Sequence, residues 1–434
     1  IEHRRRLKAD PDFVWPVDHE LLREPLAETL GVVVFQDQVL LVAQALAGFS
    51  VGEAEGLRRA MSRKRSLAAL EAYRERFVEG CARQDVDAKT ADLVYDKLVG
   101  FSGFGFPKSH AAAFGLLAYQ SAWLRHHFPA EFLCALLNAQ PMGFYPPASL
   151  VRDAQRRGVE VLPPELNASA VRCSLLPRDE SSQGRARSAV RIGLGYVRGV
   201  GEAEAEAIVA GQPYEGVADL ARRAPVSQDA LEALVAAGAC DGFGKRRQLL
   251  WRLGATQRGE SAGGGHRQLA LPLEPTAETP ELPRQTEWER MLADYKHTSL
   301  SVGVHPLTLL RPHLAREVCS TEDLRDAPHG SRVAVAGMAI ARQRPATANG
   351  VVFMLLEDEH GQVNLIVPPE VYERFRGIVR GEPLVLARGR YERVGENRNV
   401  LVSELETLGP LARRVSSEAE VSSALPQAHH FGHR

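Results

Sequence analysis

The pattern of apolar and polar positions divides the chain near residue 330. Over residues 21–127 apolar side chains recur at helical spacing, and Val39, Val42 and Leu46 form one such stripe. Further helices are predicted at 66–84 and 88–99. The glycine-rich stretch 101–110 must then be a loop, after which Ser109 is expected to cap the next helix.

The middle of the chain is predicted as short helices with connecting loops. Residues 128–170 contain two helices and an extended piece, and 177–188 are polar and basic. From 190 to 253 short helices alternate with glycine-containing turns. Residues 254–286 are rich in Gly, Pro, Glu and Gln and are predicted as a linker, followed by a short helix at 288–295.

Residues 331–408 show the pattern of short strands instead. One helix, at 370–379, separates the third strand from the fourth. Five strands with a helix in that gap are typical of an OB barrel. The predicted fold is therefore multidomain, mainly helical and then all-β, with strands at 333–340, 351–356, 362–367, 384–391 and 400–405. Residues 409–434 are predicted as a frayed tail.

Composition narrows the class of protein only partly. The 434 residues suffice for two to four domains, and the formal net charge of −1 means that a nucleic-acid partner must be argued from local patches. Five scattered cysteines without metal-ligand spacing predict a reduced, cytoplasmic protein without a zinc site. No apolar run has membrane length and no signal peptide is found, so no membrane partner is expected. The first residue is Ile, which suggests a fragment or a processed chain.

A basic cluster lies at 57–65 in the sequence LRRAMSRKR. Its cations fall within two helical turns, and guanidinium groups bind phosphate oxygens in a planar fork. Such a cluster is suited to the triphosphate of a nucleotide; a solvated basic helix face is the alternative. The members are Arg58, Arg59, Arg63 and Lys64.

The loop 103–110, GFGFPKSH, is a second candidate phosphate site. Its glycines allow close approach of backbone N–H groups, and the following helix N-terminus favours an anion. Lys108 adds a charge and His110 a hydrogen-bond donor. The spacing is not that of a P-loop, and a plain loop with a capping serine is the alternative.

Taken together, these motifs resemble a known family. GVVVFQDQ (31–38), LRRAM (57–61), GFPKSHA (105–111) and YQSAWL (119–124) resemble, in order and spacing, the fingers of bacterial C-family DNA polymerases, which include the DNA polymerase III alpha subunits. PAEFL (129–133) and LPPELN (162–167) continue the resemblance, which runs from about Leu21 to Leu408.

The resemblance implies contacts with deoxynucleoside triphosphates and with primer–template DNA. It assigns nucleotide phosphate contacts to Arg58, Arg59, Lys108, Ser109 and His110, and with less support to Arg63 and Lys64. In this family a palm domain precedes the fingers and holds three metal-binding aspartates, but no palm motif occurs in this chain. No catalytic residue or metal ligand is therefore assigned here, and Mg²⁺ is expected to bind the full-length enzyme outside this chain.

Two later segments are candidate DNA contacts. Residues 193–201 look like a helix–hairpin–helix element, with Gly199 and Gly201 presenting backbone N–H groups to phosphate, and a second unit near 230–247 contributes Lys245 and Arg246. Ordinary turns between helices are the alternative. On the barrel, Phe353 and Tyr391 are candidates for stacking on unpaired bases, with Arg388, Arg390 and Arg393 beside them. For Phe353 a core position is the favoured alternative, because Met354 and Leu356 leave the inward phase of the strand ambiguous.

The segments LLNAQPMGFY (136–145) and GLGYVRGVGEAEAE (193–206) resemble the error-prone branch of the family. That branch is associated with damage-induced translesion synthesis, with a polymerase-like accessory protein and with the sliding clamp. The linker peptide QLALPL resembles clamp-binding peptides through Gln268, Leu269, Leu271 and Leu273. A fragment of a replicative alpha subunit and a non-enzymatic DNA-binding accessory factor are the alternatives.

The expected domain organisation follows from these assignments. It consists of fingers (1–127), a helical extension (128–189), a helix–hairpin–helix region (190–253), a linker with the clamp peptide and short helices (254–330), an OB-fold domain (331–408) and a tail (409–434).

Overall fold

The computed structural model describes most of the chain. The described residues are 1–61, 67–101, 106–143, 145–177, 188–260, 280–395, 397–416, 421–426 and 428–431. They form two compact units, residues 1–123 and residues 124–434. None of the described helices combines the length and apolar character that a membrane span requires.

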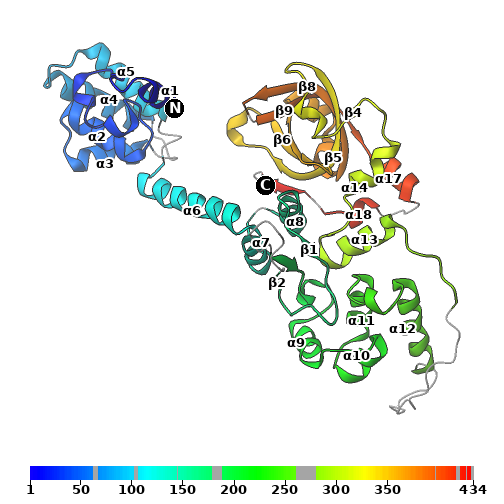
Figure 1. Ribbon diagram of the computed structural model, residues 1–434. Coiled ribbons are helices and arrows are strands. Elements are labelled where there is room, and N and C mark those ends of the chain that lie inside the picture. The colour runs from blue at the N-terminus through cyan, green and yellow to red at the C-terminus, as the bar shows by residue number, and fades with distance from the viewer. Residues whose placement is uncertain are drawn as a thin grey trace. The chain divides into compact units, whose positions relative to one another are not determined.

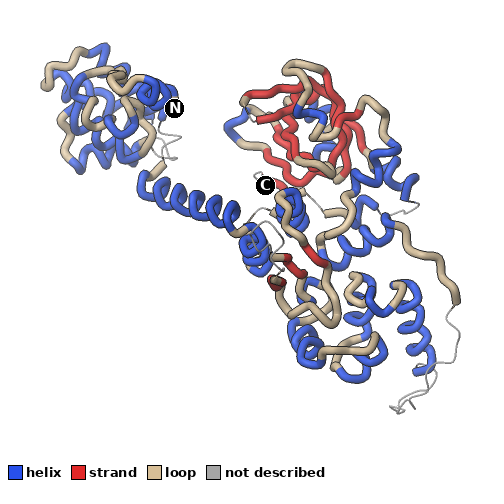
Figure 2. Tube along the Cα trace, viewed as in Figure 1, coloured by secondary structure: helices blue, strands red, loops and turns tan. Residues whose placement is uncertain are grey.

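The first unit is helical (Figures 1 and 2). The stripe predicted from Val39, Val42 and Leu46 lies buried on α2, where it packs with Phe77 and Tyr95. The helices predicted at 66–84 and 88–99 are present as α4 and α5. The elements are α1 (Glu2–Ala9), η1 (Glu20–Leu22), η2 (Ala27–Thr29), α2 (Gln36–Ala47), α3 (Val51–Ala60), α4 (Leu67–Ala82) and α5 (Ala88–Phe101).

The helix α6 (Lys108–His127) begins one residue earlier than its predicted cap. Ser109 therefore lies inside the first turn and is not the N-cap. Ala111 N–H donates to the Pro107 carbonyl at 3.0 Å, and Lys108 N–H donates to the Asp37 carboxylate at 3.1 Å. The first free N–H of α6 thus bonds to a side chain from a distant segment of the chain. The local sequence does not reveal this partner.

The second unit begins with helices and a small sheet. The strands β1 (Val161–Leu162), β3 (Ala189–Arg191) and β2 (Ser174–Leu176) pair in that order. Four helices then enclose a core of their own, with Ile208, Leu220 and Leu234 fully buried. The helices of this part are α7 (Pro129–Asn138), α8 (Pro147–Arg156), α9 (Glu202–Gly211), α10 (Val217–Arg223), α11 (Gln228–Ala236) and α12 (Arg246–Glu260), with short turns η3 (Leu194–Tyr196) and η4 (Asp241–Phe243). Because α12 continues to Glu260, the linker predicted from residue 254 starts later than expected.

The predicted OB-like barrel is confirmed (Figure 1, yellow to orange). Its strands are paired in the order β5–β6–β7–β9–β8, and β8 pairs again with β5, which closes the barrel. Only β7 and β9 run parallel within this ring. The strands are β5 (Arg332–Gln343), β6 (Val352–Glu357), β7 (Gln362–Val367), β8 (Leu384–Val394) and β9 (Asn397–Thr407); α15 (Pro369–Arg374) and α16 (Arg376–Gly381) replace the single helix predicted before β8.

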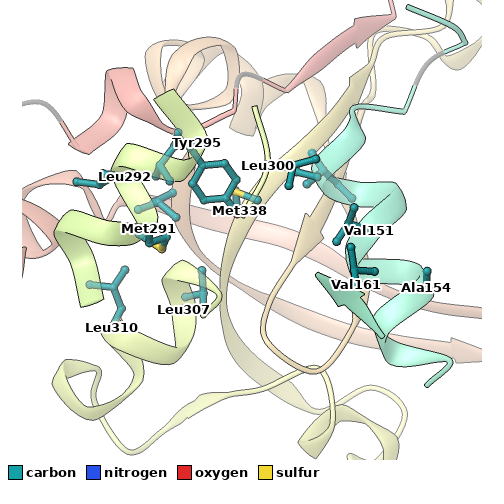
Figure 3. Close-up of a cluster of buried hydrophobic side chains, with 14 of the residues drawn as sticks. Val151, Ala154, Val161, Met291, Leu292, Tyr295, Leu300, Leu307, Leu310 and Met338 are labelled. Atoms are coloured by element: carbon teal, nitrogen blue, oxygen red, sulfur yellow. The ribbon is translucent and has the colours of Figure 1, made fainter. Parts of the chain in front are cut away.

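The barrel and the helices of this unit share one apolar core (Figure 3). Met338 of β5 lies near Met291 and Tyr295 of α13 (Glu287–Thr298), and Leu307 of α14 (Pro306–Leu310) and Val151 of α8 join the same cluster. Short connecting elements lie between α14 and β6: η5 (Arg311–His313), β4 (Val318–Cys319), η6 (Asp323–Arg325) and η7 (Ala346–Ala348).

The frayed tail predicted at 409–434 was wrong for the described residues. The segment forms α17 (Gly409–Ser416), α18 (Val421–Ala424) and β10 (His429–Phe431). Ala412 and Val421 are fully buried in the shared core, and β10 pairs parallel with β5. Small and apolar residues at helical spacing supply the contacts that the polar composition of the segment concealed.

Charged side chains join α8 and η5 to the end of β6 and to the turn that follows it. Arg156 donates to the buried Glu357 carboxylate at 3.0 Å, and Arg311 makes a two-pronged contact with Glu359 at 2.6 and 3.1 Å. His305 caps α14, with Nδ1 accepting from the Leu307 N–H at 3.1 Å. The barrel is therefore attached to the helices by ion pairs as well as by apolar packing.

Candidate nucleotide and DNA interface

The two motifs of the first unit that lie about seventy residues apart meet in space. Phe35 and Phe106 form a parallel backbone bridge, and Gln36 N–H donates to the Phe106 carbonyl at 3.1 Å. Next to this bridge the carboxylate of Asp37 accepts from the backbone N–H of Lys108. The start of α2 and the start of α6 therefore lie side by side.

Arg58 and Arg59 lie in the last turn of α3, whose start is set by a Ser50–Glu53 capping box. The carboxylate of Glu55 accepts from Arg58 twice, at 2.7 Å each, and from Arg59 Nε at 3.0 Å. The hydrogen bonds from Arg58, and then those from Arg59, lower the pKa of Glu55 to about 2. Glu55 therefore stays ionised and orients both guanidinium groups.

Asp37 also connects Arg58 to the second motif. The pKa of Arg58 is raised mainly by its hydrogen bonds to Glu55, and the negative charge of Asp37 adds to the shift. The same carboxylate accepts from Lys108 N–H, so Asp37 interacts both with the first turn of α6, through a hydrogen bond, and with Arg58, through its charge. Arg59 points further out, with 76% of its side chain exposed.

The first turn of α6 presents Lys108, Ser109 and His110 to solvent. Lys108 Nζ pairs with Glu28 at 2.6 Å, and both side chains are exposed. The His110 ring lies between Phe106 and Phe114, at centroid distances of 4.9 and 4.4 Å. This end of the helix is accessible, but the carboxylates of Asp37 and Glu28 already meet its positive charge, so an incoming anion would have to replace them.

Several predicted residues lie outside the described part of the chain. These are Arg63 and Lys64 of the basic cluster and the clamp-peptide residues Gln268, Leu269, Leu271 and Leu273. The glycines at 103 and 105 are also outside it.

Sequence reasoning missed the acidic partners of the candidate cations. Glu55 precedes Arg58 and Arg59 by three and four residues, a spacing that predicts ion pairs on one helix face. Asp37 gave no such signal, because its contact with Lys108 spans 71 residues.

In the first hairpin of the helix–hairpin–helix region, a backbone N–H group already bonds to a carboxylate of the same region. Gly199 has φ +94°, where glycine is favoured. Gly201 N–H donates to Glu204 at 2.9 Å, and Ser227 N–H donates to the same side chain at 2.8 Å. These backbone hydrogen bonds, with that from Ser227 the larger, lower the pKa of Glu204. A phosphate at Gly201 would have to displace this carboxylate.

The second hairpin leaves a different set of groups exposed. Arg246 is nearly buried and bonds to Asp241 at 2.8 and 3.0 Å and to Asp294 at 3.0 Å, so its charge serves the internal structure. Lys245 is half-buried and lies between Gly244, which has φ +145°, and the start of α12. Lys245 and the start of α12 are thus better placed for a phosphate than Arg246.

On the barrel the structure reverses two expectations. Tyr391 is fully buried in the barrel core, so its ring offers no face for base stacking. Phe353, interpreted from sequence as core, is 37% exposed. The reason is strand phase: Tyr391 alternates with the exposed Arg390, and Phe353 alternates with the buried Val352 and Met354. Arg393 is exposed and donates to the Arg325 carbonyl at 3.0 Å.

Strand register places Phe353 in a row across the outer face. Phe353 pairs with Ile366, which pairs with Leu401, and Leu401 in turn pairs with Arg390. Opposed residues of paired strands lie on the same face. The row therefore places an aromatic ring, two aliphatic side chains and an exposed guanidinium side by side.

No metal site is found in the part of the chain that the structure describes. There, no group of three or more His, Cys, Asp or Glu side chains is placed to hold an ion. The donor set that Mg²⁺ prefers, carboxylates converging with open positions, is therefore not identified among these residues.

Comparison with known proteins gives two family matches. Residues 6–85 match the finger domain of the bacterial DNA polymerase III alpha subunit, and residues 158–250 match a helix–hairpin–helix motif. An error-prone DNA polymerase from Anaeromyxobacter dehalogenans (strain 2CP-C) is 45% identical over 92% of this chain and 35% of that protein. The error-prone DNA polymerase of Burkholderia pseudomallei is 41% identical over 96% of this chain and 39% of its own.

The chain belongs to the bacterial DNA polymerase III alpha family, in its error-prone branch. A third relative, from Corynebacterium efficiens, is an error-prone DNA polymerase 40% identical over 90% of this chain. The chain spans 35–39% of the length of these three relatives. The family's finger match contains Arg58 and Arg59, and its helix–hairpin–helix match contains Gly199, Gly201 and Lys245.

Proposed function

We propose that this chain forms the part of an error-prone DNA-directed DNA polymerase that holds the incoming nucleotide and the primer–template DNA during translesion synthesis. The contact that carries the proposal is the hydrogen bond from Lys108 N–H to the Asp37 carboxylate, which holds the start of α6 beside the start of α2. The negative charge of Asp37 also acts on Arg58 of α3, so one carboxylate interacts with cationic residues of two motifs of the family. Membership of the error-prone branch supports the damage-related role.

The nucleotide contacts follow from these positions. Arg58, Arg59 and Lys108 carry charge toward one anion, and the N-terminus of α6 adds its partial positive charge. Glu55 and Glu28 neutralise these cations when no nucleotide is bound, so a triphosphate exchanges one set of ion pairs for another. Ser109 and His110 are placed in the same turn to donate hydrogen bonds. By family resemblance, Mg²⁺ held outside this chain activates the primer hydroxyl and balances the phosphate charge.

The DNA contacts are proposed on the second unit. Gly199, Lys245 and the N-terminus of α12 face phosphates without reading bases, and Arg393 adds a charge beside the barrel. The outer row containing Phe353 and Arg390 offers stacking and charge to an unpaired template base. We also propose the sliding clamp, through the Gln268–Leu273 peptide, and a polymerase-like accessory protein as partners of the cytoplasmic enzyme.

The test is single-nucleotide incorporation by the polymerase that contains this chain. Arg58→Ala, Arg59→Ala and Lys108→Ala should each lower incorporation by roughly ten-fold or more, with little change in duplex affinity, because each removes a charge that acts on the phosphates. Arg83→Ala is the matched control, since Arg83, the residue after α4, is as exposed as Arg59 and pairs with Glu79. Loss of duplex binding with normal turnover on bound DNA would instead assign these residues to the DNA backbone.

A further inference from the structure

The helix α13 lies outside the segment that matches the helix–hairpin–helix family, yet arginines of that segment bond to it. The match ends at residue 250, and α13 begins at Glu287. The apolar residues Met291, Leu292 and Tyr295 of α13 enter the core that is shared with the barrel. The same helix packs against α11, and Figure 1 shows it between the barrel and the pair α11 and α12. The helix α13 therefore contacts both the barrel and the helix–hairpin–helix region.

The first hairpin is bonded to the C-terminal end of α13. The backbone N–H of Arg198 donates to the His297 carbonyl at 2.7 Å. The Arg198 guanidinium donates to the Lys296 carbonyl at 3.3 Å and to Ser299 Oγ at 2.5 Å. A cation is favourable there, because the last carbonyls of a helix carry partial negative charge. Gly199, the proposed phosphate contact, is the next residue in the chain and is therefore held at this end of α13.

The second hairpin is bonded to α13 through Arg246. Its Nη1 donates to Asp294 Oδ1 at 3.0 Å, and the two side chains are only 10% and 20% exposed, so water screens the pair little. The same guanidinium donates to the Ala236 carbonyl at the end of α11, at 3.0 Å, and to both carboxylate oxygens of Asp241 in η4, at 2.8 and 3.0 Å. Arg246 therefore joins the turn between α11 and α12 to α13, directly beside the proposed phosphate contact Lys245.

The two hairpins also have a direct link, but it lies at a different place. Glu204 of α9 accepts from the Ser227 N–H at the start of α11. The turn that precedes Lys245 follows the other end of that helix, nine residues or about 13 Å further on. The bond from Arg246 to α13 is therefore made at the turn itself, where the link through Glu204 does not reach.

We propose that α13 positions both hairpins for duplex DNA. By holding Arg198 and Arg246 it fixes Gly199 relative to Lys245, so that both reach phosphates of one duplex together. Two contacts that are already fixed bind more tightly than two that must be ordered on binding. Arg246 and Asp294 are then positioning residues that do not touch DNA. The inference rests on the proposed function for the DNA contact itself.

The charge of Asp294 separates positioning from a direct electrostatic effect on DNA. DNA is a polyanion, so loss of a carboxylate that acts on it through space should strengthen binding. Loss of a carboxylate that holds Arg246 should weaken binding instead. Asp294→Asn removes the charge and keeps the size of the side chain. Arg246→Lys is the complementary variant, because lysine keeps the positive charge but lacks the planar fork of five donors.

The test is the affinity of this chain for a short duplex of arbitrary sequence, measured by fluorescence anisotropy over a range of salt concentrations. We expect Asp294→Asn, Arg246→Lys and Arg246→Met each to weaken binding about five-fold or more, although they change the net charge differently. Lys245→Ala should weaken binding and reduce the salt slope by about 0.9, as loss of one phosphate contact requires. Arg222→Met is the control, since Arg222 is an exposed arginine of α10 in the same region that pairs with Asp219. It should stay within about two-fold of the unmodified chain.

Amide hydrogen exchange gives a second readout that requires no DNA. In Asp294→Asn, residues 238–246 should exchange about ten-fold faster, while residues 202–209 of α9 exchange as before. Unchanged exchange at 238–246 would show that the turn is held without α13. Ser301→Ala is a milder variant, because it removes only the bond from Ser301 Oγ to Asp294 Oδ2 at 3.2 Å. It should move affinity and exchange in the same directions, by about two-fold.

The outcomes separate this inference from the proposed function. Tighter binding by Asp294→Asn, or unchanged affinity in Arg246→Lys, would overturn the positioning role; if Lys245→Ala still weakens binding, the proposed DNA contact stands without it. Equal weakening by Arg222→Met would mean that net charge explains the effects, and would also overturn it. If Lys245→Ala leaves the affinity unchanged, the second hairpin is not a DNA contact, and the proposed function fails there together with the inference.

Discussion

Arg156 on α8 and Glu357 on β6 form an ion pair, with Nη2 and Oε2 3.0 Å apart and the Glu357 side chain fully buried. Gln362 donates to the same carboxylate oxygen at 2.9 Å. Burial raises the pKa of Glu357, and the charge of Arg156 acts in the opposite direction. Arg156 therefore offsets part of the unfavourable burial of the Glu357 carboxylate, at the place where the helices contact the barrel.

Removal of Arg156 should destabilise this joint strongly. Arg156→Met leaves Glu357 buried without its cation, and we expect a loss of about 3 kcal/mol in the free energy of unfolding. Urea unfolding followed by circular dichroism measures this. Arg157→Met is the control, because Arg157 is half exposed and its pair with Asp153 should contribute less than about 1 kcal/mol. Equal losses of unfolding free energy in the two variants would show that the buried ion pair stabilises the protein no more than the exposed one.

His305 should make stability depend on pH. Burial, and then the charges of Arg152, Arg156 and Arg311, lower its pKa well below the usual 6.5, so the folded state keeps the ring neutral. The unfolded chain takes up a proton near pH 6.5, and stability therefore falls as the pH drops below that value, by up to about 1.4 kcal/mol per pH unit.

His305→Asn should remove this slope while retaining a side chain able to cap α14 through the Leu307 N–H. Glu357 faces the same ring at 3.9 Å. The raised pKa of Glu357 has the opposite effect on the free energy of unfolding, because stability is lost as the pH rises above about 4.5. It is present in both proteins, so the difference between their pH profiles isolates His305. Parallel profiles would reject the assignment.

The two aromatic residues of the barrel should show opposite phenotypes. Tyr391→Ala is expected to cost about 4 kcal/mol of stability, because it empties a fully buried position, and to leave the affinity of the folded protein for oligothymidylate unchanged. Phe353→Ala should weaken that affinity by about ten-fold with a stability change below about 1 kcal/mol. Unfolding and oligonucleotide titrations of both variants decide between them. A large stability loss in Phe353→Ala would place that ring in the core after all.

The linker peptide 268–273 is predicted to bind the clamp independently of DNA binding. Gln268→Ala combined with Leu271→Ala and Leu273→Ala should abolish clamp binding, since the glutamine and the spaced leucines are the groups expected to enter an apolar groove. DNA binding by the same variant, measured without clamp, should be unchanged. Glu274→Ala, at the residue directly after the peptide, is the control, and full clamp affinity in the triple variant would reject the motif.

Sequence reasoning succeeded where periodicity is strong. The strands at 362–367 and 384–391 lie within β7 and β8, and the stripe on α2 lies in the core. It failed for Tyr391 and Phe353 because both strands carry apolar residues at adjacent positions. Alternation alone then leaves the inward phase undetermined.

Long-range contacts account for the rest. Nothing local to Asp37 predicts that its carboxylate bonds to Lys108 N–H, and nothing local to Glu204 predicts a bond from Ser227 N–H. The candidate cations could be found as a cluster of charge, but the carboxylates that orient them are set by tertiary packing. Arg246 is an example. Its charge next to a hairpin suggested a contact with DNA, but in the structure Arg246 forms ion pairs with Asp241 and Asp294.

The pairing of β10 with β5 has a consequence for how the protein is made. His429 pairs with Ala341, so β5 leaves the ribosome 88 residues before the strand that covers this edge. At bacterial synthesis rates the interval is about 4 to 18 s, during which the stretch Ala341–Gln343 has no β10 neighbour. An open strand edge invites pairing with other nascent chains, and charged residues discourage it. Arg342 lies in the middle of this stretch, and two of its guanidinium nitrogens have no hydrogen-bond partner in the finished barrel. We therefore expect its charge to discourage edge-to-edge pairing while the barrel is incomplete.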